Sequence, residues 1–233
     1  MRAVALLLAC LAVPAAAGAA EPVDVALVLV SDVSRSIDDS EYRLQKQGYR
    51  AAFTSPEVTA AIAGGSVGAI AVAYVEFASP VDVRTVLDWR VIRSAADAGR
   101  FAAALEAAPR TARGRTAIGE GIALATDDLA RAPVAAARQV IDVCGDGTSN
   151  SGRDVTAARD AAVAAGITIN GLAIINDHPV SWVFAHVQPP GGLAKWYQDH
   201  VTGGPGSFVV EVHDFAAFGR AITRKLVDEI AAR

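Results

Sequence analysis

The sequence predicts a three-layer α/β/α, Rossmann-like domain with a mainly parallel central sheet and one antiparallel edge strand. Short apolar runs typical of buried strands alternate with helix-like segments along the chain. Residues rich in Asp, Ser and Gly follow directly after two of these runs, where open α/β sheets bind their ligands. Because the chain shows no internal repeat and no linker, residues 21–233 are expected to form a single domain.

Apolar runs bounded by turn residues mark the expected strands. Residues 25–30 form an unbroken run of Val, Ala and Leu, which indicates a parallel strand buried on both faces. Further buried strands are expected at residues 67–77, 138–144, 167–175 and 207–212. Residues 81–89 alternate in part and follow the second strand after a break at Ser79-Pro80, so they are expected to form its antiparallel edge partner.

Apolar periodicity and capping residues mark the expected helices. Asp38 followed by Glu41 forms a capping-box pattern, and the helix that begins there should end before Ser55-Pro56. Further helices are expected at residues 94–107, from 116 to before Pro133, at 154–165 and at 214–231. Residues 176–205 show a less regular pattern.

Composition places the chain among ordinary globular proteins. Of its 233 residues, 52% are hydrophobic and 20% are charged, which disfavours a disordered chain. The formal net charge is −4 and basic residues form no cluster. We therefore expect no nucleic-acid partner.

The N-terminus has the pattern of a secretory signal peptide over residues 1–20. Met1-Arg2 precede the apolar residues 3–13, and the small residues at 17–19 offer an A-x-A cleavage site. A lipoprotein signal at Cys10 is the alternative interpretation. No other apolar run has the length of a membrane span, so we expect a secreted or periplasmic protein.

Cysteine content excludes an intramolecular disulfide in the processed chain. Cys10 would leave with the signal peptide, and Cys144 would remain alone on a predicted strand. A free cysteine in such a strand usually behaves as a small buried hydrophobe. A reactive thiol is the alternative.

Three polar loops are expected to meet at one edge of the sheet. They contain Asp32-Val33-Ser34-Arg35-Ser36, Gly114-Arg115-Thr116 and Gly145-Asp146-Gly147, and each lies where a strand ends or a helix begins. Their hydroxyls and carboxylates are hard oxygen ligands of the kind that Mg²⁺ prefers. These loops therefore predict a divalent-metal site.

Over roughly residues 22–231 the chain resembles a von Willebrand factor type A (VWA) domain. The positions that match, in order and context, the family's metal-ion-dependent adhesion site (MIDAS) are Asp32, Ser34, Ser36, Thr116 and Asp146. The resemblance implies that Ser34 and Ser36 bind the metal directly, and that Thr116 does so when a partner is bound. It also implies that Asp32 and Asp146 act largely through bound water, and that an acidic group of the partner fills the sixth position.

More narrowly, three segments resemble a group of short secreted bacterial VWA-like proteins to which no function is assigned. These segments cover residues 32–38, 114–119 and 201–208. This narrower resemblance indicates fold and metal but no particular partner.

The same residues also allow plainer interpretations. Asp32, Ser34 and Ser36 could form a turn and helix cap, and Asp146-Gly147 an ordinary turn. The histidines at 178, 186, 200 and 213 have no spacing typical of a zinc site. The aromatic residues at 182, 184, 196 and 197 are expected to pack a long loop over the sheet, with partner contact as the alternative.

These observations favour a non-enzymatic binding domain that uses Mg²⁺, or Mn²⁺ or Ca²⁺, to capture an Asp or Glu carboxylate of a protein partner. Arg35 and Arg115 flank the expected ligands and could steer an anionic partner. One alternative is a Mg²⁺-dependent hydrolase or phosphoryl-transfer enzyme with Asp32 as nucleophile. Another is a structural subunit of an envelope assembly.

Overall fold

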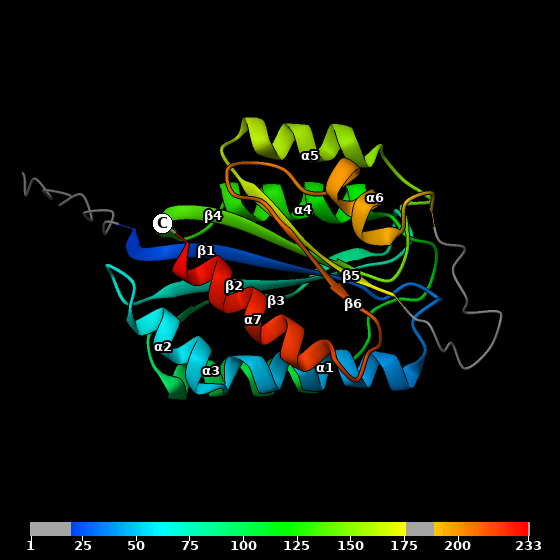
Figure 1. The fold of residues 1–233 in the computed structure, drawn as a ribbon. Coiled ribbons are helices and arrows are strands. Elements are labelled where there is room, and N and C mark those ends of the chain that lie inside the picture. The colour runs from blue at the N-terminus through cyan, green and yellow to red at the C-terminus, as the bar shows by residue number, and fades with distance from the viewer. Residues whose placement is uncertain (1–19, 176–188, 233) are drawn as a thin grey trace, which may run out of the picture.

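The computed structural model describes residues 20–175 and 189–232. In this part of the chain six strands form one sheet in the spatial order β3-β2-β1-β4-β5-β6 (Figure 1). The strands are β1 (Glu21–Asp32), β2 (Ile70–Phe77), β3 (Val83–Ile92), β4 (Val134–Gly145), β5 (Thr168–Ile174) and β6 (Val209–Val212). β3 pairs antiparallel with β2 at the edge of the sheet, and the other neighbouring pairs are parallel. The predicted sheet is confirmed.

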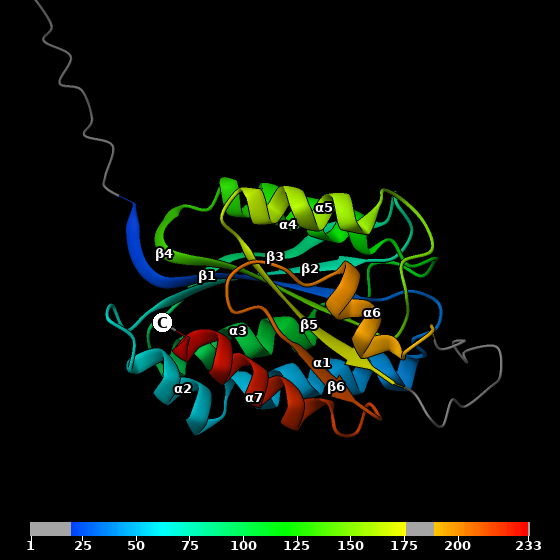
Figure 2. The ribbon, with the colours of Figure 1, turned by 45° about the horizontal axis from the view of Figure 1, so that its top comes forward.

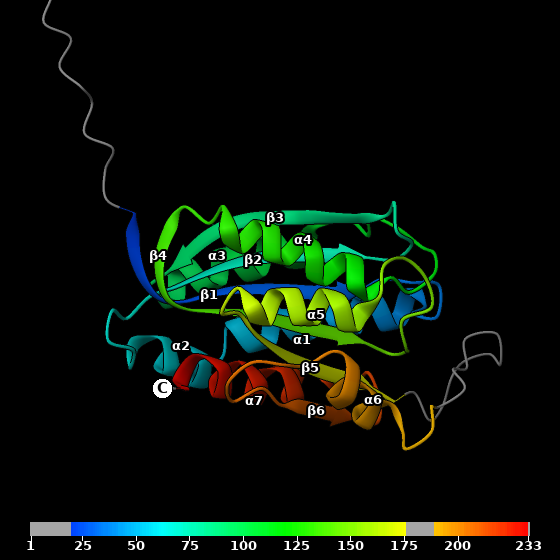
Figure 3. The same cartoon turned by 90° about the horizontal axis from the view of Figure 1, so that it is seen from above.

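Helices cover both faces of this sheet, which confirms the three-layer α/β/α architecture (Figure 2). One face carries α1 (Asp39–Phe53), α2 (Pro56–Ala63), α3 (Ala95–Ala107) and α7 (Phe218–Ala231). The other face carries α4 (Ile118–Ala130), α5 (Val155–Ala164) and α6 (Leu193–His200), and Figure 3 shows α4 and α5 lying over the sheet from that side.

Strand β1 lies at the centre of the molecule, and its residues face two separate apolar cores. Leu27 and Leu29 pack into the core under α1, α3 and α7, whereas Val28 and Val30 pack into the core under α4 and α5. A strand buried on both faces needs apolar residues at successive positions, which explains the unbroken run predicted from the sequence.

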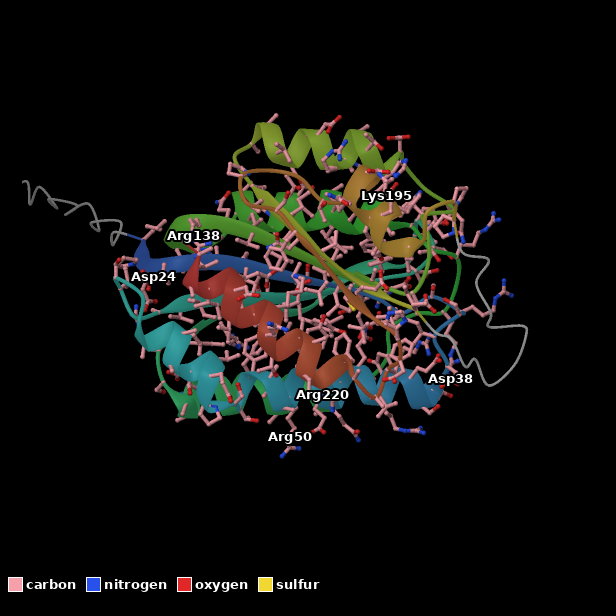
Figure 4. The ribbon with its side chains drawn as sticks, viewed as in Figure 1. Asp24, Asp38, Arg50, Arg138, Lys195 and Arg220 are labelled. Atoms are coloured by element: carbon pink, nitrogen blue, oxygen red, sulfur yellow. The ribbon has the colours of Figure 1, made fainter. Side chains whose placement is uncertain are left out.

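The start of α1 confirms the predicted capping box. The Asp38 carboxylate accepts hydrogen bonds from the backbone N–H groups of Ser40 and Glu41, and Glu41 accepts one from the backbone of Asp38. Burial raises the pKa of Asp38, but these hydrogen bonds outweigh it, so the pKa is lowered. Asp38 lies at the end of the domain opposite Asp24 and Arg138 (Figure 4).

Two helices were not expected from the sequence. α2 begins directly at Pro56, and its cap Ser55 accepts a hydrogen bond from the backbone of Val58 at 3.2 Å, so the Ser-Pro pair starts a helix as well as ending one. α6 lies within the segment interpreted as irregular and follows Gly191 and Gly192, which both have positive φ. Residues 176–188, with two of the four histidines and Trp182 and Phe184, lie outside the described residues.

Two helix starts shift from their expected positions. α4 begins at Ile118, two residues after Thr116, which leaves the threonine in the preceding loop. α7 begins at Phe218, and Asp214 instead closes the turn ahead of it by accepting a hydrogen bond from the backbone of Ala217 at 2.5 Å. Across the described ranges no helix is long and apolar enough to cross a membrane.

A buried cluster of charged side chains fixes α7 to the sheet. We call this the charge cluster: Asp142 of β4, Asn170 of β5, and Lys225 and Glu229 of α7. The Lys225 ammonium lies 2.6 Å from Asp142 Oδ1 and also pairs with Glu229. Asn170 Nδ2 donates a hydrogen bond of 2.9 Å to Glu229 Oε1. One ammonium group of the chain itself therefore pairs with both carboxylates of the cluster.

Cys144 lies on β4 and is buried, as predicted. Gln45 Nε2 lies 3.7 Å from its sulfur atom in a hydrogen-bonding arrangement. Burial and the nearby Asp142 carboxylate raise the pKa of the thiol well above its usual range. These surroundings keep the thiol protonated and favour the structural interpretation over the reactive one.

Candidate metal centre

The three predicted loops meet at the carboxyl ends of the parallel strands. Ser34 Oγ lies 3.0 Å from Ser36 Oγ, and Ser36 Oγ donates a hydrogen bond of 2.8 Å to Asp146 Oδ1. Thr116 Oγ1 lies 3.4 Å from Ser34 Oγ, and Asp32 Oδ1 accepts a hydrogen bond of 2.7 Å from the Ser34 backbone. We call these five side chains the oxygen cluster. The structure brings together all five predicted residues.

Strand pairing explains how the two carboxylates of the oxygen cluster come together. β1 and β4 are parallel neighbours, and Ser31 is in register with Cys144. Asp32 and Asp146 therefore leave adjacent strands at nearly the same level. Between them, Gly145 leaves room for the Asp32 side chain, because a Cβ atom at this position would lie 3.1 Å from Asp32 Oδ2.

Neighbouring segments hold Thr116 in place through its backbone. Its N–H donates to Asn150 Oδ1 at 3.0 Å, and its carbonyl accepts from the Asn150 N–H at 2.9 Å. The Arg35 N–H also donates to the Gly114 carbonyl at 2.9 Å, which joins the two hydroxyl-bearing loops. These hydrogen bonds hold the Thr116 backbone beside the Ser34 loop, and its hydroxyl lies 3.4 Å from Ser34 Oγ.

Arg110 is a supporting residue that sequence reasoning did not identify. Its Nη2 atom donates hydrogen bonds of 2.7 Å to the carbonyls of both Val33 and Ser34, and its Nε donates to the Ala112 carbonyl at 3.0 Å. The guanidinium also lies over the Tyr42 ring, 5.3 Å from its centroid. In the sequence this arginine was one polar residue of a loop, and nothing local indicated that it would reach the backbone around Ser34.

A second buried ion pair anchors the loop that contains Arg110. Glu76 accepts hydrogen bonds from the Thr111 backbone and hydroxyl at 3.0 and 2.7 Å, and it lies 3.2 Å from the Lys46 ammonium. Burial lowers the pKa of Lys46, although Glu76 partly offsets this effect. This pair balances its own charge and therefore has a structural role.

Burial restricts access to the oxygen cluster. Asp32, Ser34, Thr116 and Asp146 are at most 3% exposed, and Ser36 is partly exposed. Arg35 and Arg115 are exposed on either side of it. A small ion could reach these oxygens, whereas a large ligand would contact mainly Ser36 and the two arginines.

The spacing of the oxygen atoms suits a small cation. Adjacent ligands of an octahedral ion with bonds of about 2.1 Å lie about 3.0 Å apart. The distances of 3.0 Å from Ser34 to Ser36 and 2.8 Å from Ser36 to Asp146 agree with this value. Hydroxyl and carboxylate oxygens could therefore hold Mg²⁺ or a similar hard cation here.

No described part of the chain resembles a conventional zinc site. Residues 20–175 and 189–232 hold no group of three or more His, Cys, Asp or Glu side chains that could bind a metal. His200 stacks on Trp196 at 5.0 Å, and His213 lies 3.0 Å from Glu211. The ligand atoms of the oxygen cluster would be mainly hydroxyl oxygens rather than imidazole nitrogens.

The aromatic residues of α6 that the structure describes behave as expected for packing. Tyr197 is completely buried, and Trp196 packs edge-on against its ring at 5.8 Å. Gly171 of β5 lies directly under the Tyr197 ring. α6 therefore packs its aromatic side chains against the sheet.

The chain belongs to the family described as "Protein of unknown function (DUF1194)", which matches residues 22–233. No curated protein matches the sequence. Several solved structures share its fold, at identities low enough that the likeness shows the fold alone.

One similar structure is proximal thread matrix protein 1 from the mussel byssus with a zinc-occupied MIDAS motif: 17% identity and a TM-score of 0.66, over 91% of this chain and 49% of that one. Another is a von Willebrand factor type A structure from Catenulispora acidiphila, with 17% identity and a TM-score of 0.57 over 89% of this chain and 43% of that one. A third is the pilus adhesin SpaC from Lactobacillus rhamnosus GG, with 15% identity and a TM-score of 0.61 over 90% of this chain and 31% of that one. The chain spans half or less of these proteins, and the resemblance to VWA domains is confirmed.

Proposed function

We propose that this member of the DUF1194 family is a non-enzymatic binding domain that holds a divalent metal and captures an acidic group of a protein partner outside the cytoplasm. The residues proposed to hold the metal are Asp32, Ser34, Ser36, Thr116 and Asp146. The observation that supports this proposal best is the contact among three hydroxyls and a carboxylate from three separate loops, at distances of 2.8–3.4 Å.

The ligand chemistry favours capture of a carboxylate. A bound cation held directly by neutral hydroxyls keeps more positive charge than one held by several carboxylates, so it attracts an incoming acid more strongly. Ser34 and Ser36 would supply direct ligands, while Asp32 would orient the Ser34 loop through the hydrogen bond it already accepts. Thr116 is held by Asn150 at a position from which its hydroxyl could bind when a partner arrives.

Two comparisons support a binding function and a divalent metal. The mussel relative holds zinc in its MIDAS motif, which favours a divalent ion at the matching residues here. The pilus adhesin is named for adhesion, which favours a protein or surface partner. The oxygen ligands of this chain favour Mg²⁺ or Mn²⁺ as the resident ion.

The test compares thermal melts of the full chain in EDTA and in Mg²⁺ or Mn²⁺. At 100 times its dissociation constant a metal should stabilise the wild type by about 2.7 kcal/mol. Asp32→Ala should lose this response. Asp160→Ala is the matched control, because Asp160 is an exposed aspartate that pairs with Arg159 rather than with the cluster. A wild-type melt that does not respond to metal would contradict the proposal.

The partner is tested separately by capture from envelope extract in Mg²⁺ and in EDTA. Proteins retained by the wild type only with metal, and not retained by Asp32→Ala, would support the binding function. Phosphatase or esterase turnover that disappears in Asp32→Ala would instead support the hydrolase alternative and exclude a purely binding role.

A further inference from the structure

Helix α6 brings a tyrosine to the inner side of the oxygen cluster. An added Cβ atom at Gly171 would lie 2.9 Å from Tyr197 Cδ1, and one at Gly145 would lie 2.7 Å from the Tyr197 hydroxyl oxygen. Neither glycine has a positive φ, so the backbone does not require glycine at these positions. The two glycines make room for the Tyr197 ring and for the hydroxyl at its end.

The Tyr197 hydroxyl lies beside the predicted metal ligands. The Cβ position at Gly145 that is 2.7 Å from this hydroxyl is also 3.1 Å from Asp32 Oδ2, so both oxygens flank the same point. Burial, followed by the negative charge of Asp32, raises the pKa of Tyr197. The residue is fully buried, and among the described residues its hydroxyl has no hydrogen-bond partner.

A buried hydroxyl without a partner destabilises the protein that contains it. Phenylalanine would fill the same space between Gly145 and Gly171 without that cost. Tyr49 provides a contrast, because it is equally buried and its hydroxyl lies 2.9 Å from Ser31 Oγ. The Tyr197 hydroxyl therefore suits a state in which a further group lies on this side of the cluster.

We propose that Tyr197 is a positioning residue of the metal centre, an inference that rests on the proposed function. When a cation is bound, the Tyr197 hydroxyl donates a hydrogen bond on the Asp32 side, either to the Asp32 carboxylate or to a water molecule that this carboxylate holds. Residues that donate hydrogen bonds to the groups around a metal fix the orientation of those groups and strengthen metal binding. α6, which lies more than 40 residues beyond the last predicted ligand, thereby becomes part of the site.

The test compares Tyr197→Phe with Tyr49→Phe in the full chain. Without metal, Tyr197→Phe should melt at or above the wild-type temperature because it removes an unpartnered hydroxyl, whereas Tyr49→Phe should melt lower because it breaks the contact with Ser31. In titration calorimetry with Mn²⁺, Tyr197→Phe should bind roughly tenfold more weakly. Tyr49→Phe should bind Mn²⁺ with wild-type affinity.

Two outcomes would overturn the inference while leaving the proposed function intact. One is Mn²⁺ binding to Tyr197→Phe as tight as to the wild type, and the other is a metal-free melt of this variant clearly below the wild-type temperature. If the wild type itself binds no Mn²⁺, the proposed function is contradicted, and the inference about Tyr197 falls with it.

A second variant tests the same contact from the sheet. Gly145→Ala places a methyl group against the Tyr197 hydroxyl and should weaken Mn²⁺ binding. Combining it with Tyr197→Phe, which removes the crowded oxygen, should add less than the two separate losses. Strict additivity would mean that the hydroxyl has no part in the effect of Gly145→Ala.

Discussion

The oxygen cluster and the charge cluster are both buried polar groups of the central sheet, but they are balanced in different ways. In the charge cluster a lysine of the chain itself, Lys225, lies 2.6 Å from Asp142 and pairs with Glu229. In the oxygen cluster the contacts between side chains join hydroxyls to one another and to a carboxylate, such as the 2.8 Å contact from Ser36 to Asp146. Negative and neutral oxygens are gathered there at the spacing that a cation requires.

If the proposed function is right, the charge cluster serves the fold and the oxygen cluster serves a ligand, and the two should respond differently to metal. A buried ion pair that is complete within the chain destabilises the protein when one partner is removed, whatever the solution contains. A site completed by an ion from solution responds to that ion by mass action. Stability measured with and without metal should therefore separate the two clusters.

Lys225→Met is expected to have the largest effect. It leaves the Asp142 and Glu229 carboxylates buried without their cation, which should lower the free energy of unfolding by about 3–5 kcal/mol. Urea unfolding measures this change, and it should be the same in EDTA and in Mg²⁺. A loss that disappears when metal is added would mean that the two clusters are not independent.

Stability should also depend on pH through the charge cluster. Burial, with Asp142 nearby, raises the pKa of Glu229 from 4.5 to about 7. A raised pKa means that the folded state holds the proton more tightly, so this stabilisation is complete below pH 4.5 and is lost as pH rises through 7. The difference corresponds to roughly 3 kcal/mol. Burial also raises the pKa of Asp142, which acts in the same direction.

The control for this pH dependence is Glu229→Gln. Glutamine keeps the size of the side chain and removes its titration, so the fall in stability between pH 4.5 and 7 should become shallower. Unfolding of both proteins by urea across this range measures the slopes. Parallel curves for wild type and variant would show that another group titrates.

Arg110→Ala should have a smaller effect, located at the oxygen cluster. The variant removes hydrogen bonds to the carbonyls of Val33 and Ser34. Without metal this loss should lower the free energy of unfolding by about 1–2 kcal/mol. It should also weaken metal binding. Arg113→Ala is the matched control from the same loop, because Arg113 is exposed and its pair with Asp39 should contribute little. Melts of both variants in EDTA and Mn²⁺ should separate them; equal behaviour would argue against a supporting role for Arg110.

The sequence predicted the oxygen cluster because its residues form local patterns. Asp32, Ser34 and Ser36 are adjacent in the chain, and parallel strands bring Thr116 and Asp146 to the same edge. The charge cluster leaves no such pattern, since the helical periodicity places Lys225 beside Ile222 on the inner face but does not reveal Asp142 opposite it. Arg110 and Tyr197 were missed for the same reason: each acts across the fold on atoms that only the tertiary structure brings near.

The starts of helices were also predicted best where the signal lies in the adjacent residues. Capping residues such as Asp38 and Ser94 located helix starts correctly because the signal is local. Ser55-Pro56 was interpreted only as a stop, although proline at the first turn also starts helices, and α2 was missed. The signal peptide at residues 1–20 stays a prediction, because residues 1–19 lie outside the described part of the chain.

The buried thiol of Cys144 can be used to measure how often strand β4 opens in the native protein. The sulfur atom lies in a central strand, one residue before Gly145 and two before Asp146, and is completely shielded. A thiol-labelling reagent can reach it only when this strand opens, so the labelling rate measures how often the sheet separates at that point. An ion held at the adjacent loops would slow that opening, and mass spectrometry would follow the delay without any engineered label.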